Sequence, residues 1–244
     1  MDKAELNPLQ TMKVYTHYKT IEEFNVGYRW RTILQFGSSW NVIGSVVMMN
    51  PGSANYKYGS NCWIEDETIL DCLRPFDYLG DQGEKWFEFN ADATMGCVAD
   101  LFAQYYGIHS QKDLQGVIQI FNLFYLREPN LGDALMKNKE LSFFKQINDA
   151  IFEHDIAALK QPVYLGFGGL ARTADFREKA MLYFYEVVEK HNAKYLDEDF
   201  DKNSFTHPLR LMRYIKNTPE GIIKRQQFCN NCVTIESNQN IKQP

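Results

Sequence analysis

Three short apolar runs, each followed by a turn that contains asparagine or glycine, constrain the fold of this chain more than any other feature. They cover residues 42–49, 116–121 and 163–167, and they lead to Asn50, Asn122 and Gly168. Nearly continuous apolar runs of this length are typical of strands buried on both faces of a parallel sheet. Residues 138–159 and 172–191 carry apolar side chains close to the helical period of 3.6.

Strands that alternate with helices predict an α/β fold with helices on both faces of a parallel sheet. We expect a three-layer α/β/α sandwich around a mostly parallel four-stranded sheet, with the fourth strand at residues 193–196. Residues 28–36 favour a further strand, and residues 1–25 favour helix or an extended arm. A single domain covers residues 1–233, in which residues 60–115 are a helical and loop elaboration, and residues 234–244 form a flexible tail.

The composition narrows the class of protein. The 244 residues include 26 Lys and Arg against 31 Asp and Glu, a net charge of −5. This balance excludes a basic protein that coats nucleic acid. The first residues are polar and acidic, and no apolar run reaches the ~18 residues of a membrane span, so we expect a cytoplasmic monomer without a membrane partner. Of five cysteines, only Cys229 and Cys232 have metal-site spacing, and they lack a second pair; we predict no metal and no cofactor.

One segment is basic, although the chain as a whole is acidic. Residues 202–225 contain six Lys or Arg and one Glu. Leu209 and Leu211 lie among Arg210, Arg213 and Lys216. Apolar side chains beside phosphate-binding cations suit a protein that pushes into a duplex and extrudes a nucleotide. An amphipathic helix with its apolar side in the core is the other interpretation.

Polar residues follow the predicted strands, at the sheet edge where α/β proteins bind ligands. Their order resembles that in the uracil-DNA glycosylase superfamily: Asn50-Pro51-Gly52 after the first strand, Asn122 after the second, a glycine turn after the third, and then His207-Pro208. The resemblance spans residues 42–214. The chain is more similar to an uncharacterised bacterial family, domain of unknown function 1643, through the motifs at residues 50–54, 66–69, 122–124 and 207–209.

The superfamily resemblance implies a DNA glycosylase, which hydrolyses the N-glycosidic bond of a damaged or modified pyrimidine flipped out of DNA and leaves an abasic site. Asn50 would position the attacking water, and His207 would donate a hydrogen bond to the departing base. Asn122 would pair with the edge of the base. Further base-binding residues would be Pro51, Gly52, Ser53 and an aromatic ring that stacks on the base, Tyr58 or its neighbours Tyr56 and Trp63.

Gly52 stands where, by the same resemblance, the strictest uracil enzymes have a tyrosine that blocks substituents at C5 of the pyrimidine. We therefore expect a pocket that accepts bulky C5 groups, such as those in some phage DNA, which would make the protein an antiviral defence enzyme. A turn with positive φ is the other interpretation of Gly52. Because Asn50 cannot act as a general base, a non-catalytic nucleic-acid or nucleotide-binding module is the alternative function. A hydrolase or transferase of free nucleosides is the third.

Overall fold

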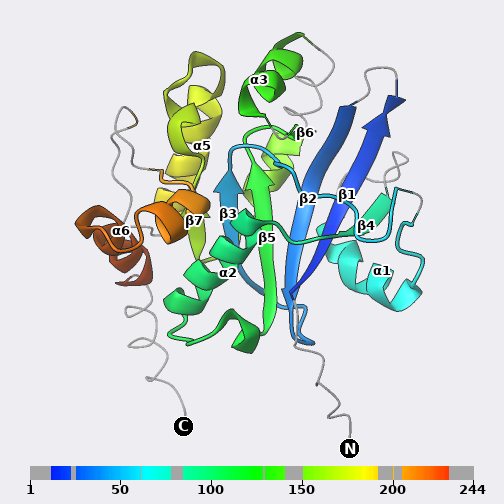
Figure 1. Cartoon of the computed structure of the whole chain (residues 1–244), viewed down its shortest axis with the longest axis horizontal. Helices are drawn as coiled ribbons and strands as arrows, with labels where there is room; N and C mark the ends of the chain where they lie inside the picture. Colours follow the sequence, from blue (N-terminus) through cyan, green and yellow to red (C-terminus); the bar gives the residue numbers. More distant parts are fainter. Residues whose placement is uncertain are drawn as a thin grey trace, which may run out of the picture.

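A mixed seven-stranded sheet with helices on both faces forms the protein (Figure 1). The computed structural model describes residues 12–22, 26–60, 62–77, 85–128, 130–140, 151–191, 200 and 205–230. The strand order is β4-β1-β2-β5-β3-β7, and the short β6 pairs with β2. The predicted strand at 193–196 and the predicted tail lie outside the described residues. Within those ranges, no helix is long and apolar enough to cross a bilayer.

The parallel half of the sheet contains the three apolar runs. Strand β3 (Val42–Met48) lies between β5 (Gly116–Asn122) and β7 (Val163–Leu165) and is parallel to both. Every residue of β5 and β7 is buried, as the apolar character of these runs predicted. The α/β class and the positions of these three strands are confirmed.

The other half of the sheet is antiparallel, so the prediction of a mostly parallel four-stranded sheet is wrong. Strand β2 (Val26–Phe36), predicted at 28–36, runs antiparallel to β5, to β1 (Lys13–Ile21) and to β6 (Leu126–Arg127). Strand β4 (Lys85–Phe89) pairs with β1 at the sheet edge. The expectation of helix or arm for the N-terminal segment is therefore wrong for residues 13–21. The strand was not predicted because its sequence contains many polar residues. Inside the sheet such a residue can find a hydrogen-bond partner: the Thr16 hydroxyl donates to the Arg31 carbonyl oxygen at 2.8 Å.

Helices cover both faces of the sheet because neighbouring strand residues point to opposite sides. Val46 packs in a cluster with residues of α2 (Ala93–Tyr105) and α6 (Pro219–Asn230). Val47 packs in the opposite cluster, with residues of α3 (Leu131–Glu140) and α5 (Ala174–His191). The predicted helix at 138–159 overlaps the end of α3, which begins at Leu131, and residues 151–157 are also helical. Residues 141–150 are not described. Residues 60–115 contain the strand β4 besides α2, α1 (Glu67–Leu73) and the 3-10 turns η2 (Arg74–Phe76) and η3 (Gln111–Asp113).

A β-bulge in β2 determines the face of the sheet to which the Arg29 side chain points. Thr16 of β1 pairs with Thr32, whereas Tyr18, two residues later, pairs with Arg29, three residues away from Thr32. Strand β2 therefore holds one extra residue at this point. In a regular strand, residues three apart point to opposite faces. The extra residue brings Arg29 and Thr32 to the same face, where both line one cavity.

Candidate functional site

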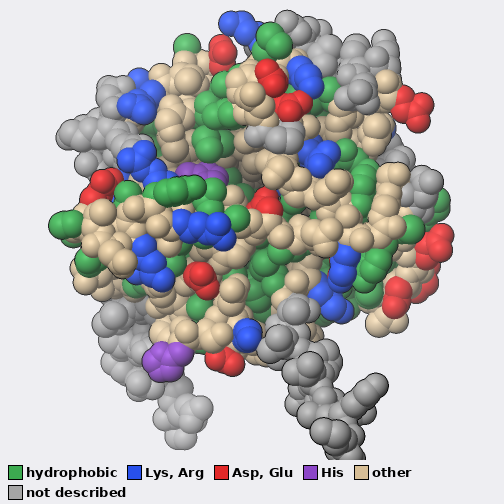
Figure 2. Space-filling view, viewed as in Figure 1, with side chains coloured by type: hydrophobic (Ala, Val, Ile, Leu, Met, Phe, Trp, Pro, Cys, Tyr) green, Lys and Arg blue, Asp and Glu red, His purple; other side chains and the backbone are tan. Residues whose placement is uncertain are grey.

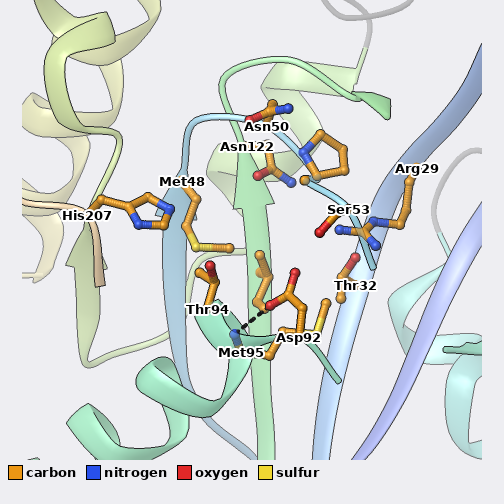
Figure 3. A pocket seen from close by; sticks show the side chains of 13 residues that line it. Arg29, Thr32, Met48, Asn50, Ser53, Asp92, Thr94, Met95, Asn122 and His207 are labelled. Carbon is orange, nitrogen blue, oxygen red and sulfur yellow. Dashed lines mark hydrogen bonds between the residues drawn. The ribbon is translucent and has the colours of Figure 1, made fainter. Parts of the chain in front are cut away.

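A cavity of ≈ 210 Å³ opens at the carboxyl ends of β3 and β5 (Figure 3). Six of the residues that line it were predicted from the sequence: Asn50, Pro51, Gly52, Ser53, Asn122 and His207. These residues come from three segments, the first and last of which are more than 150 positions apart, and the fold brings them together. The remaining lining residues were not predicted; they are Arg29, Thr32, Met48, Asp92, Thr94, Met95 and Ile120.

Asn50 is held by its own amide group. Its Nδ2 donates to the backbone carbonyl oxygen of Glu128 at 3.1 Å. This bond fixes the orientation of the amide and leaves Oδ1 as a hydrogen-bond acceptor. Two arginines stabilise the turn that follows: Arg29 Nη1 and Arg127 Nε both donate to the carbonyl oxygen of Ala54, at 3.3 and 2.9 Å.

Gly52 takes up the backbone conformation that favours glycine, with φ = 69°. A Cβ added at this position would meet nothing closer than Oδ2 of Asp92, at 3.8 Å. Both interpretations of this glycine therefore have a geometric basis: the turn needs positive φ, and the missing side chain leaves open space on the cavity side of the turn.

Two buried polar atoms in the cavity wall, Asn122 Oδ1 and Arg29 Nε, have no hydrogen-bond partner in the described part of the chain. Asn122 is 1% exposed, and its Oδ1 accepts no hydrogen bond from any described residue. Arg29 is 3% exposed, and its Nε–H donates to none of them. Burial lowers the pKa of Arg29 to about 10, against the opposing effect of Asp92, so the guanidinium remains charged at neutral pH. Because unsatisfied buried groups cost ~1–3 kcal/mol each, a ligand that forms hydrogen bonds with these two atoms would recover that free energy.

His207 is positioned by the end of β7. The Tyr164 hydroxyl donates to the Thr206 carbonyl oxygen at 2.7 Å, and the Gly168 amide donates to that of Phe205 at 2.7 Å. Gly166 permits close approach, since a Cβ there would lie 2.8 Å from Cδ of Pro208. The His207-Pro208 segment thus packs directly against β7 and the glycine turn that follows this strand.

The chemistry of the imidazole follows from its surroundings. Burial lowers the pKa of His207 to about 4, although nearby Asp92 acts in the opposite direction. The ring is therefore neutral at pH 7. Its Nδ1 accepts a hydrogen bond from the Leu209 amide at 3.3 Å, which places the single ring proton on Nε2. Figure 3 shows the ring directed toward the cavity, so His207 offers a neutral N–H donor there.

Asp92 brings a carboxylate to the opposite side of the cavity. It is the N-cap of α2: its Oδ1 accepts from the Met95 amide at 2.9 Å, the dashed line in Figure 3. This bond holds one oxygen and leaves Oδ2 on the side of Gly52. Asp92 acts electrostatically on both His207 and Arg29. The cavity therefore combines a carboxylate, a guanidinium, two amides and an imidazole.

The predicted stacking ring is not in the cavity. Tyr58 is 62% exposed and lies near the Lys57 ammonium group, 5.1 Å from the ring centroid. Tyr56 packs on Tyr18 and Phe89 in the core. Trp63 pairs with β4 and carries the Lys85 ammonium over its ring. Tyr58, predicted for the base pocket, is not among the residues that line the cavity, because its neighbours Tyr56 and Trp63 pair with Phe89 and Phe87 of β4 at the sheet edge. The apolar lining comes from Met48, Met95, Ile120 and Pro51 instead.

The basic segment after His207 divides into exposed cations and buried apolar residues. Leu211, in the π-helical turn η5 (Arg210–Tyr214), is fully buried against α2 and α6, so its prediction as an apolar DNA contact is wrong; Leu209 is partly buried on the same cluster. Arg210, Arg213 and Lys216 are exposed. Figure 2 shows Lys and Arg side chains gathered over this region and α6, beside a histidine. Tyr214 is the large exposed side chain of this turn, at 74%.

Among the described residues, no group of three His, Cys, Asp or Glu side chains is arranged to hold a metal ion. Cys229 is partly buried at the end of α6, and Cys232 lies outside the described ranges. Comparisons with protein-family models, with curated proteins and with solved structures gave no match.

Proposed function

We propose that the protein is a DNA glycosylase that hydrolyses the N-glycosidic bond of a modified pyrimidine flipped out of DNA. The observation that carries this proposal is the convergence of Asn50, Asn122 and His207 on one cavity. These residues supply a fixed acceptor, a buried unpartnered acceptor and a neutral N–H donor. Cleavage of a base–sugar bond needs a placed water, a held base and a donor at the departing base.

The size and polarity of the cavity support a pyrimidine. An apolar cavity of ~150 Å³ accommodates benzene, so ≈ 210 Å³ has room for one ring with a substituent. Asn122 Oδ1 calls for an N–H on the ligand, whereas His207 Nε2 and Arg29 Nε call for acceptors. An N–H flanked by carbonyl groups, the edge that uracil and its 5-substituted derivatives carry, satisfies this set. The open space at Gly52 supports a substituent on that ring.

The surface around the cavity supports DNA rather than a free nucleoside as the substrate. Exposed Arg210, Arg213 and Lys216 follow His207 within ten residues, in a chain that is acidic overall. Cations at such a position bind phosphates on either side of an extruded nucleotide. Tyr214, exposed among them, has a ring that can stack on a base left in the duplex.

The test is an excision assay on single- and double-stranded oligonucleotides that contain uracil, 5-hydroxymethyluracil or 5-hydroxymethylcytosine, with abasic sites scored by alkaline cleavage. We expect Asn50→Ala and His207→Ala each to reduce excision by ~10²–10³. Exposed residues of the same types provide matched controls, and Asn55→Ala and His109→Ala should leave the rate unchanged. Tight binding without excision by the wild type would support the nucleic-acid-binding module instead.

A further inference from the structure

The carboxylate of Asp92 has no role in the proposal above. Asn50, Asn122 and His207 are neutral, whereas Arg29 and Asp92 bring opposite charges to the same cavity. Asp92 reaches it from the start of α2, an element with no part in the sequence motifs. Asn122 Oδ1 and Arg29 Nε in the same wall are buried and have no hydrogen-bond partner among the described residues, which favours a ligand in this cavity.

The depth at which each group lies in the cavity indicates which part of a bound nucleotide it would contact. Asn122 is 1% exposed, whereas Asp92 is only partly buried and Ser53 is exposed. A base whose edge faces Asn122 therefore points its sugar toward Asp92. Oδ2 of Asp92 lies across from Gly52, in the turn that also carries Asn50. Asn50 and Asp92 are both partly buried, so both lie nearer than Asn122 to the mouth of the cavity, where the sugar would lie.

The position of Asp92 is fixed and electrostatically supported. Its Oδ1 is engaged by the Met95 amide, so the carboxylate cannot turn away from the cavity without breaking the cap. The start of a helix stabilises negative charge, and Arg29 provides a second positive group. A carboxylate with one oxygen held and the other free is suited to accept a proton.

We infer that Asp92 is the catalytic carboxylate of this site, a role that rests on the proposed glycosylase function. The oxygen of a water, oriented by Asn50 Oδ1, bonds to C1′ of the sugar while the C1′–N bond breaks. The electron pair of that bond leaves with the base, whose carbonyl accepts a hydrogen bond from His207. One proton of the water passes to Asp92 Oδ2 and from there, directly or through solvent, to the anionic base. The products are an abasic sugar and the neutral free base.

The test uses Asp92→Asn in the full chain, because asparagine is as good an N-cap as aspartate and keeps the bond to Met95 while removing the charge. We expect the single-turnover excision rate to fall by ~10²–10⁴ with unchanged affinity for the oligonucleotide. Asp92→Ala should be restored in part by added formate, which supplies a small carboxylate, whereas formate should not help Asp92→Asn, whose amide still fills the space. Asp100→Asn, at an exposed position of the same helix, is the matched control.

The outcomes separate this inference from the proposed function. Excision by the wild type together with an undiminished rate in Asp92→Asn overturns the role of Asp92 and leaves the glycosylase proposal standing. No excision of any probe by the wild type overturns both. Asp92→Ser provides a second uncharged cap, and loss of the fold in both it and Asp92→Asn would assign the carboxylate a structural role and overturn the inference.

Discussion

Gly166 offers a test of how the third strand positions the histidine. An alanine Cβ at this position would lie 2.8 Å from Cδ of Pro208 and 3.0 Å from Cε1 of Tyr164. Carbon atoms pack at ~3.5–4.0 Å, so Pro208 has to move away by at least ~0.7 Å. His207 is the preceding residue and moves with it. Because a misplacement of ~1 Å can cost ~10²-fold in rate, we expect Gly166→Ala to slow excision by about tenfold to a hundredfold.

The same substitution should lower the free energy of unfolding by ~1–3 kcal/mol, the usual cost of overpacking, as measured by urea titration. Gly96 is the matched control, since it lies in α2 and an added Cβ there meets nothing within 4 Å. Gly96→Ala should stabilise the protein by ~1 kcal/mol and leave excision unchanged. A Gly166→Ala protein with wild-type stability and wild-type excision would refute the packing argument.

Three further predictions concern stability and DNA binding. Burial and Arg31 lower the pKa of His17 to about 4, so between pH ~6.5 and ~4 the unfolded chain binds a proton at this residue that the folded chain does not. The free energy of unfolding, measured by urea titration at both pH values, should therefore fall by ~3 kcal/mol as the pH is lowered across this window. The fall should be smaller in His17→Phe. Asn122→Leu removes an unsatisfied buried oxygen, and it should raise the free energy of unfolding by ~1 kcal/mol while abolishing excision; a destabilised variant would show that Oδ1 has a partner. Arg210→Ala and Arg213→Ala should each reduce the salt dependence of DNA affinity, the slope of log K against log salt, by ~1, with exposed Lys112→Ala as control; unchanged slopes would place the phosphates elsewhere.

The sequence was most informative where a side chain directly follows a buried strand. Asn50 and Asn122 could be placed in one site because parallel strands end at the same edge of a sheet. His207 could be added only through the family resemblance, and its contacts with β7 depend on Gly166 and Tyr164. Tyr58 was misassigned because nearness to Asn50 in sequence says nothing about the direction of the chain after the Gly52 turn.

The two charged residues of the cavity were missed for different reasons. Asp92 did carry a signal, since an aspartate before a run with apolar residues at helical spacing predicts an N-cap, but the site that this cap faces depends on tertiary structure. Arg29 carried none, because an arginine within a β-rich segment predicts only an exposed position. Leu211 was misread because apolar residues among cations are compatible both with a DNA-facing wedge and with a core-facing turn.

The bulge in β2 separates the length of the strand from the side of the sheet on which Arg29 lies. Regular pairing of all the residues present would turn Arg29, three positions from Thr32, to the face opposite the cavity. Deleting one residue between Arg29 and Thr32 would remove the bulge and leave the two residues two positions apart, so the guanidinium would stay on the cavity side. A shorter β2 without a bulge would therefore present the same arginine to the cavity.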